Sequence, residues 1–260
     1  MSETFYYITF FILTLIVSFY LNGYINKIFV GNKLTDPVNE RSSHKYPATR
    51  SGGLSVFFTI CLACAFGVST GKLVIPLYAL LSVFFLTLTG FADDLINVRY
   101  REKFFLQIFA AVLMFQSGYS IDSFHGVFNI YEVPWWLELT SSLFVFVVVV
   151  NALNLIDGLD GMASFISMKF FLIAGGIILV SKTEWFLFFP IIISALVGFL
   201  WFNFNRNKKV FLGDTGSLFL GSLMAFFVFY FLDSESSLVT DPLISRPLLT
   251  VLMLLYPLVD

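Results

Sequence analysis

Apolar stretches of membrane-spanning length recur along almost the whole 260-residue chain. A helix needs roughly 20 residues to cross a hydrocarbon core of about 30 Å, and nine stretches approach that length. They are residues 5–29, 54–70, 73–91, 104–118, 136–153, 162–180, 185–203, 215–232 and 246–259. Only 12% of the residues are charged, whereas a soluble domain carries about 25%. The sequence therefore predicts an all-α polytopic helix bundle with about nine spans, forming one integral-membrane domain over residues 1–260.

The fourth stretch is the least certain span, because it is short unless residues 100–103 extend it. The first stretch lacks a charged start and a small-residue cleavage site, so we interpret it as a retained helix and not as a signal peptide.

Lysine and arginine are distributed unequally between the alternate loops. One set of loops holds eleven and the other holds three, and cytoplasmic loops carry the excess of positive residues. The larger set is Lys27, Lys33, Arg41, Lys45, Arg50, Arg99, Arg101, Lys103, Arg206, Lys208 and Lys209; the smaller set is Lys72, Lys182 and Arg246. The sequence thus predicts that the first set is cytoplasmic and that the N-terminus lies outside.

Four segments on the predicted cytoplasmic face combine acids, amides and glycines. They are residues 36–53, 90–107, 144–165 and 203–221. A carboxylate within the hydrocarbon is costly, so acids at the ends of membrane helices need a reason. Each segment alone has a bland interpretation as a helix cap, a turn or a topology signal. Their convergence on one face favours a functional site.

The acids of these segments suit a divalent cation with phosphate. Asp93 and Asp94 are adjacent, and repulsion between neighbouring carboxylates is relieved by a cation or by a proton on one of them. Asp214 lies between Gly213 and Gly216, where the backbone can approach a phosphate closely. Magnesium prefers one or two carboxylates together with water and substrate phosphate. Basic residues suited to a diphosphate are Arg50, Lys103, Arg206, Lys208 and Lys209.

Asn154 and Asp157 are three residues apart and so face the same way on a helical turn. Such a pair could hold a base, a sugar or metal-bound water. Asn151, one turn earlier, is equally consistent with a hydrogen bond between helices. No GxxxxGK[ST] motif occurs, which argues against a P-loop nucleotidase.

Four motifs in these segments, taken in chain order, resemble those of the polyprenyl-phosphate N-acetylhexosamine-1-phosphate transferases. The resemblance rests on "DPVNERSSHKYPATRSGG", "GFADDLINV", "NALNLIDGLDGMAS" and "FLGDTGSLFLG", and it covers nearly the whole chain. The first motif is more similar to the enzymes that initiate O-antigen and capsule synthesis than to the peptidoglycan branch of the family.

The resemblance implies transfer of an N-acetylamino-sugar 1-phosphate from a UDP-sugar to polyprenyl phosphate, with release of UMP. It implies that Asp214 is a ligand of Mg²⁺, with Mn²⁺ as an alternative. It also implies catalytic roles for Asp93, Asp94 and Asp157, and a place for Asn154 and Asp157 at the nucleotide end of the pocket. Whether an aspartate acts as a base, a metal organiser or a nucleophile stays open.

The resemblance also implies a set of substrate-binding residues. Lys103 and Gln107 stand where the family has a basic residue and an amide near phosphate, and Asp160 is a weaker candidate at the nucleotide end. The remaining members by resemblance are Arg50, Gly52 and Gly53, expected to shape the entrance. Arg206 joins the substrate-binding set for its charge, which suits the diphosphate.

The implied partners are a UDP-N-acetylamino sugar, polyprenyl phosphate and the lipid bilayer. No nucleic acid is expected, and a homodimer is left open. The implied location is the inner (plasma) membrane, crossed several times, with the active site in the cytoplasm. UDP-GlcNAc, a 6-deoxy N-acetylamino sugar and UDP-GalNAc all fit.

One departure from the family concerns the end of the chain, "LLYPLVD". Members of the family continue through a loop rich in His and Arg and then closing helices, so we expect this part to be missing. A non-catalytic truncated member is therefore an alternative to an enzyme. A secondary transporter is a weaker alternative, because transporters place such acids near the bilayer midplane and show paired repeats.

Overall fold

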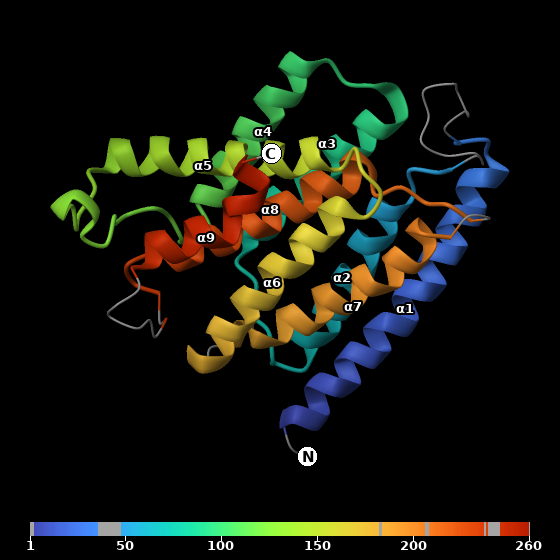
Figure 1. Cartoon of the computed structure of the whole chain (residues 1–260), viewed down its shortest axis with the longest axis horizontal. Helices are drawn as coiled ribbons and strands as arrows, with labels where there is room; N and C mark the ends of the chain where they lie inside the picture. The colour runs from blue at the N-terminus through green and yellow to red at the C-terminus, as the bar shows by residue number, and fades with distance from the viewer. Residues whose placement is uncertain are drawn as a thin grey trace.

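The computed structural model describes residues 3–35, 48–181, 184–205, 208–236, 238 and 245–259, without the side chains of Glu3, Thr4, Phe128 and residues 256–259. The described residues form α-helices and short 3₁₀ turns, which confirms the predicted all-α class (Figure 1). The α-helices are α1 (Glu3–Gly31), α2 (Gly52–Ser69), α3 (Leu77–Ile96), α4 (Tyr100–Phe115), α5 (Trp135–Ile156), α6 (Met162–Ser181), α7 (Phe188–Asn203), α8 (Gly213–Leu232) and α9 (Arg246–Val259); the 3₁₀ turns are η1 (Val127–Asn129) and η2 (Glu184–Leu187).

Seven helical segments in the described part of the chain are long and apolar enough to cross a membrane. They correspond to α1, α2, α3, α5, α6, α8, and α7 together with η2. The two remaining stretches form shorter helices: α4 has 16 residues and α9 has 14. The chain is thus a multi-pass membrane protein, while the prediction of nine spans is not confirmed.

Helix α8 lies at the centre of the bundle. Every residue from Thr215 to Leu232 is buried, and α2, α3, α5, α6 and α9 all contact it. Helix α1 lies outside this ring, packed against α7 and α2 (Figure 1). Since α8 carries Asp214 in its first turn, the most buried helix also carries the strongest metal-ligand candidate.

Glycines allow three helices to approach α8 closely. A Cβ atom on Gly53 of α2 would lie 2.2 Å from the backbone nitrogen of Gly216, and one on Gly90 of α3 would lie 2.4 Å from the carbonyl oxygen of Asp214. On α8 itself, a Cβ on Gly221 would lie 2.9 Å from the Cα of Val150 in α5. Small residues at helix contacts are expected in a membrane, because lipid supplies no hydrophobic drive and close van der Waals packing must replace it.

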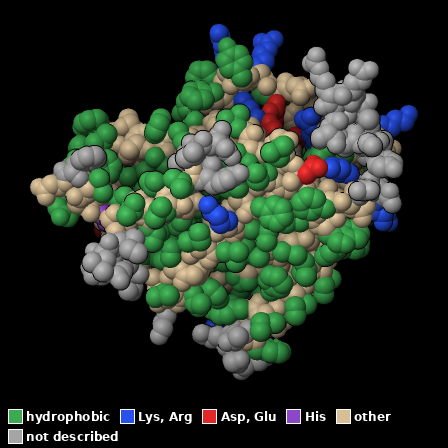
Figure 2. Space-filling model, in the orientation of Figure 1, with side chains coloured by type: hydrophobic (Ala, Val, Ile, Leu, Met, Phe, Trp, Pro, Cys, Tyr) green, Lys and Arg blue, Asp and Glu red, His purple; other side chains and the backbone are tan. Residues whose placement is uncertain are grey.

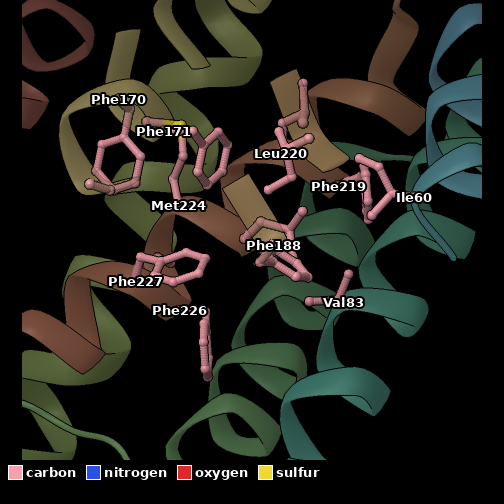
Figure 3. Packing of buried hydrophobic residues seen from close by; sticks show 14 of the residues in the cluster. Ile60, Val83, Phe170, Phe171, Phe188, Phe219, Leu220, Met224, Phe226 and Phe227 are labelled. Carbon is pink, nitrogen blue, oxygen red and sulfur yellow. The ribbon is translucent and has the colours of Figure 1, made fainter. Parts of the chain in front are cut away.

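Aromatic side chains fill the interior of the bundle farther from Asp214. Phe227 of α8 packs edge-on against Phe171 of α6 and at a tilt against Phe188 and Phe189 of α7 (Figure 3). Aromatic rings in such offset and edge-on arrangements stabilise a core beyond simple burial. The result is a rigid support beneath the polar end.

Charged side chains gather at one end of the bundle, at the upper right of the space-filling view, while the rest of the visible face is mainly hydrophobic (Figure 2). We call this end the polar end. It contains the last turns of α1, α3, α5 and α7 and the first turns of α2, α4, α6 and α8. Three of the four segments singled out in the sequence meet here, together with residues 48–53 of the first; residues 36–47 of that segment lie outside the described part.

Candidate active site

The two adjacent acids at the end of α3 have different partners. Asp94 accepts hydrogen bonds from the backbone N–H of Asp214 (3.0 Å) and from the N–H (2.9 Å) and hydroxyl (2.6 Å) of Thr215. Its side chain is 2% exposed, and it holds negative charge at the N-terminus of α8, where the helix dipole favours it. Asp93 instead accepts the N–H of Val98 at 2.7 Å. Asp94 therefore joins α3 to α8, whereas Asp93 is available to the site.

Lys103 links Asp93 to Asp214. Its Nζ donates to Asp93 Oδ2 at 2.8 Å and forms a second ion pair with Asp214 Oδ2. The lysine belongs to the first turn of α4 and the acids to α3 and α8, so three helices meet at one ammonium group. A positive charge between two carboxylates stabilises both, and it marks the place where a cation is favoured.

The last turn of α5 completes the arrangement. The Asn154 amide donates to Asp214 Oδ1 at 3.0 Å and to Ser217 Oγ at 2.8 Å, which fixes the orientation of the Asp214 carboxylate. Asp157 directly follows α5. Burial raises the pKa of Asp157 well above its ordinary value, and the negative charges of Asp214 and Asp94 raise it further, against the opposing effect of a hydrogen bond from the Gly213 backbone.

Two other predicted residues, Arg50 and Asp160, form ion pairs beside this cluster. Arg50 Nη1 lies 3.7 Å from Asp94 Oδ1, with its side chain 41% exposed. Asp160 forms an ion pair with Lys209, whose Nζ lies 5.5 Å from the ring centroid of Phe211. Asp160 thus ties the turn between α5 and α6 to the segment that precedes α8. Arg206 lies outside the described residues.

Gln107 is buried and bonded to Asn151. The two side-chain amides exchange hydrogen bonds of 3.2 and 2.7 Å between α4 and α5. This confirms the interpretation of Asn151 as a contact between helices. The role of Gln107 near phosphate stays a prediction, since its amide is already engaged.

Gly52 and Gly53 are buried beneath the segment before α8. Their N–H groups donate to the carbonyl oxygens of Phe211 (3.0 Å) and Leu212 (2.8 Å). A Cβ on Gly52 would lie 2.3 Å from the ring of Phe199. Both glycines therefore serve close packing, and their expected part in shaping the entrance stays a prediction.

A cavity of about 460 Å³ adjoins the cluster between α4 and α5. Its lining combines aromatic side chains with amides and cations. Its lining residues are Tyr100, Arg101, Lys103, Phe104, Phe105, Gln107, Asn151 and Asn154. The cavity thus joins an apolar wall to the groups that contact Asp93 and Asp214, which suits an amphipathic ligand with an anionic head.

The chemistry of the donors fits magnesium. The oxygen atoms of Asp93, Asp214 and Ser217 are hard ligands, and Asn154 already holds Asp214 in place. Among the described residues, no group of three His, Cys, Asp or Glu side chains forms a complete cage. Magnesium needs no such cage, because it keeps waters and takes oxygens from substrate phosphates.

The structure brings together a central group of the residues predicted from the sequence. Asp93, Lys103, Asn154 and Asp214 are joined by direct contacts, and Asp94 supports them through the backbone of α8. Thr215 and Ser217 were not predicted individually from the sequence, although both lie in the segment 203–221. The signal that could have found them is their position within three residues of Asp214 at the beginning of α8.

Comparisons with known proteins agree with this geometry. The family model described as "Glycosyl transferase family 4" matches residues 76–232, which include α3 to α8 and all four directly linked residues. The chain belongs to glycosyl transferase family 4.

Individual relatives are transferases by name. The chain is 29% identical over 226 residues to a probable undecaprenyl-phosphate N-acetylglucosaminyl 1-phosphate transferase of Bacillus subtilis, covering 81% of this chain and 59% of that protein. It is 30% identical over 233 residues to the phospho-N-acetylmuramoyl-pentapeptide-transferase of Streptococcus sanguinis, covering 83% of this chain and 69% of that protein. The chain thus spans about three fifths to two thirds of the length of these relatives.

Proposed function

We propose that this protein transfers an N-acetylhexosamine 1-phosphate from a UDP-sugar to polyprenyl phosphate. An oxygen of the lipid phosphate forms a bond to the β-phosphorus, the bond between that phosphorus and the bridging oxygen breaks, and UMP leaves with the bridging oxygen. The observation that carries the proposal is the meeting of Asp93, Lys103, Asn154 and Asp214 from four helices beside the cavity between α4 and α5. The names of the relatives support this chemistry.

The position of the acids favours this function over transport. They lie at the ends of α3 and α5 and at the beginning of α8, not at the middle of a span. A polyprenyl chain would stay in the bilayer while its phosphate reaches the polar end, where a water-soluble nucleotide can arrive. The aromatic wall of the cavity, which includes Phe104 and Phe105, suits the lipid side of that encounter.

Charge is the main obstacle to a reaction between two phosphate-bearing substrates. The Lys103 ammonium, placed between Asp93 and Asp214, would move onto phosphate oxygens as the substrates enter. Asn154 would keep the Asp214 carboxylate oriented meanwhile. A lipid phosphate is largely ionised near neutral pH, since the second pKa of a phosphate monoester is about 6. The site therefore needs charge stabilisation more than a strong base.

Asp214 and Asp93 are the residues that we propose to hold Mg²⁺, with Mn²⁺ as an alternative. When bound, the ion would neutralise charge on the diphosphate and on the departing UMP. Asp94 would act through α8, because it fixes the backbone of Asp214 and Thr215. Asp157, at the end of α5, would face the nucleotide.

We propose that the polar end faces the cytoplasm, that the N-terminus lies outside, and that the protein resides in the plasma (inner) membrane. The excess of lysine and arginine at the polar end supports this orientation. The sugar, the glycan pathway and a homodimer are further points for experiment.

The test is a transfer assay with purified protein in detergent. Undecaprenyl phosphate, MgCl₂ and a panel of UDP-N-acetylamino sugars are supplied, and both UMP and lipid-linked diphosphate sugar are measured. The Asp214→Asn variant should lose at least about 100-fold in rate, as expected when a group that stabilises transition-state charge is removed. The matched control is Glu132→Gln, an exposed acid outside the polar end, which should retain activity.

Equal loss in both variants, or turnover that is unaffected by Asp214→Asn, would place the chemistry elsewhere. No lipid-linked product with any sugar, while the protein remains folded, would contradict the proposed function for this chain.

A further inference from the structure

The segment before α8 is held by a second segment from the beginning of the bundle. Residues 209–212 run parallel to residues 49–53, and Thr49 forms a β-bridge with Val210. The four backbone hydrogen bonds run from Thr49 N–H to Lys209 O (3.3 Å), from Phe211 N–H to Thr49 O (2.7 Å), from Gly52 N–H to Phe211 O (3.0 Å) and from Gly53 N–H to Leu212 O (2.8 Å). Two residues beyond this pairing, α8 presents Asp214.

Buried polar side chains reinforce the pairing from both sides. The Thr49 hydroxyl donates to Asn26 Oδ1 of α1 at 2.8 Å and lies 2.8 Å from the Ser51 hydroxyl. On the other side, the Asn203 amide at the end of α7 donates to the carbonyl oxygen of Val210 at 2.8 Å. All four side chains are buried, with Thr49 1% exposed and Asn203 2% exposed. We call Asn26, Thr49, Ser51 and Asn203 the polar frame.

The bonds of the polar frame differ from those of other buried polar residues nearby. Thr59 of α2 donates only to Ser55 O of its own helix, and Asn22 of α1 donates only within its own helix, to Ser18. These bonds satisfy a buried polar group locally. The bonds of Thr49 and Asn203, in contrast, join separate segments, and each leads to residues 209–212.

Asp214 is thereby fixed through two routes. Its own N–H is bonded to Asp94, and the chain immediately before it is held by the polar frame. Gly213 between them has φ 71°, a left-handed conformation that turns the chain sharply into the helix. A shift of residues 209–212 would therefore change the approach of the backbone at Asp214, and a misplacement of about 1 Å can cost about 100-fold in rate.

We propose that Thr49 and Asn203 are positioning residues, which set residues 209–214 for binding of the nucleotide diphosphate. This inference rests on the proposed function for its substrate, but the geometry that it describes can be tested without turnover. Asn26 acts through Thr49, so the end of α1 contributes to a site that it does not touch.

The experiment uses the whole chain in detergent and measures two quantities. Hydrogen–deuterium exchange reports the protection of three amides that donate in the pairing, those of Gly52, Gly53 and Phe211, and transfer assays give kcat and KM for each substrate. The variants are Thr49→Val, which keeps the shape but removes the hydroxyl, and Thr49→Ser, which restores it. Thr59→Val is the matched control, a buried threonine on the neighbouring helix whose hydroxyl bonds only locally.

Thr49→Val should accelerate exchange at the amides of Gly52, Gly53 and Phe211 at least tenfold and raise KM for the UDP-sugar at least tenfold, leaving KM for polyprenyl phosphate unchanged. Thr49→Ser should restore both quantities, and Thr59→Val should change neither. If Thr49→Val behaves like Thr59→Val, or if Thr49→Ser fails as Thr49→Val does, the inference is overturned.

Three further outcomes are informative, and the second separates this inference from the proposed function. If Thr49→Val does not fold, Asn203→Leu replaces it, with Asn22→Leu as the matched control, and the same exchange pattern is expected. If the wild-type chain shows no turnover but the exchange results hold, the positioning of residues 209–213 stands and the proposed function falls. If exchange is unchanged in Asn203→Leu as well, the frame does not hold the segment.

Discussion

Replacing Asp94 by asparagine should destabilise the protein more than the same replacement at its neighbour Asp93. The Asp94 carboxylate accepts three hydrogen bonds from the beginning of α8, two of them from backbone N–H groups. Asparagine offers one oxygen, and its NH₂ group would face a donor, so one buried N–H of α8 would lose its partner. That loss costs about 1–3 kcal/mol.

A second contribution comes from charge. A negative side chain at a helix N-terminus contributes about 0.3–1 kcal/mol at the surface and up to about 2 kcal/mol when partly buried. Relief of carboxylate burial offsets part of this, so the net cost of Asp94→Asn is about 2–3 kcal/mol. At roughly 2–4 °C per kcal/mol for a chain of this size, the midpoint of thermal unfolding should fall by about 5–10 °C.

The assay is thermal unfolding in detergent at a fixed heating rate, because membrane proteins often unfold irreversibly and the midpoint is then operational. Asp93→Asn is the control. Asparagine at that position can still accept a hydrogen bond from the N–H of Val98, and Lys103 keeps its ion pair with Asp214. The unfolding midpoint should therefore shift by less than about 3 °C, which corresponds to about 1 kcal/mol or less. Equal midpoints for the two variants would refute the division of roles between the adjacent acids.

Three further substitutions test the site and its packing. Lys103→Gln removes the charge that Asp214 faces and should lower kcat/KM for UMP release at least about 100-fold; a loss below about threefold would contradict its proposed role. Gly53→Ala should cost about 1–3 kcal/mol, because its Cβ would lie 2.2 Å from a backbone nitrogen of α8, whereas Gly176→Ala has nothing within 4 Å and should not destabilise. Equal unfolding midpoints for the two alanine variants would contradict the packing argument. Asn154→Ala frees the Asp214 carboxylate and should lower kcat at least about tenfold without changing the unfolding midpoint by more than about 3 °C, so an unchanged kcat would count against it.

The helices could be predicted from the sequence because their signal is local. An apolar stretch of about 20 residues must be helical to satisfy its backbone in a membrane, whatever its neighbours are. The two stretches that do not reach this length, α4 and α9, are the ones for which the predicted span count is not confirmed. Their helical state could be predicted from composition, but the two helices are too short for their length alone to establish that they cross the membrane.

The grouping of the site could also be predicted, but the partners within it could not. Placing Asp93, Lys103, Asn154 and Asp214 on one face required only the alternation of loops and the order of the motifs. That Asp94 bonds the backbone of α8 while Asp93 faces Lys103 depends on where three helices meet, and two adjacent aspartates look alike in a sequence.

The polar frame left no signal of its own beyond the segments that contain part of it: Thr49 and Ser51 lie in residues 36–53 and Asn203 in residues 203–221. Asn26 and Asn203 stand in apolar helices, and Thr49 belongs to a loop, so no spacing relates them. Their relation arises from the parallel pairing of residues 49–53 with residues 209–212, which are about 160 positions apart. Such pairing is a tertiary property, and it cannot be predicted from the positions of neutral polar residues in the sequence.

The central claim is that carboxylates from separate helices hold a divalent cation together with the nucleotide diphosphate. The most direct measurement is electron paramagnetic resonance of Mn²⁺, titrated into the purified wild type, Asp214→Asn and Glu132→Gln, each with and without a UDP-N-acetylamino sugar. The account predicts that the wild type and Glu132→Gln bind Mn²⁺ more tightly when the nucleotide is present, and that Asp214→Asn loses this gain. Binding of Mn²⁺ that is the same in all three proteins, or that ignores the nucleotide, would contradict the account.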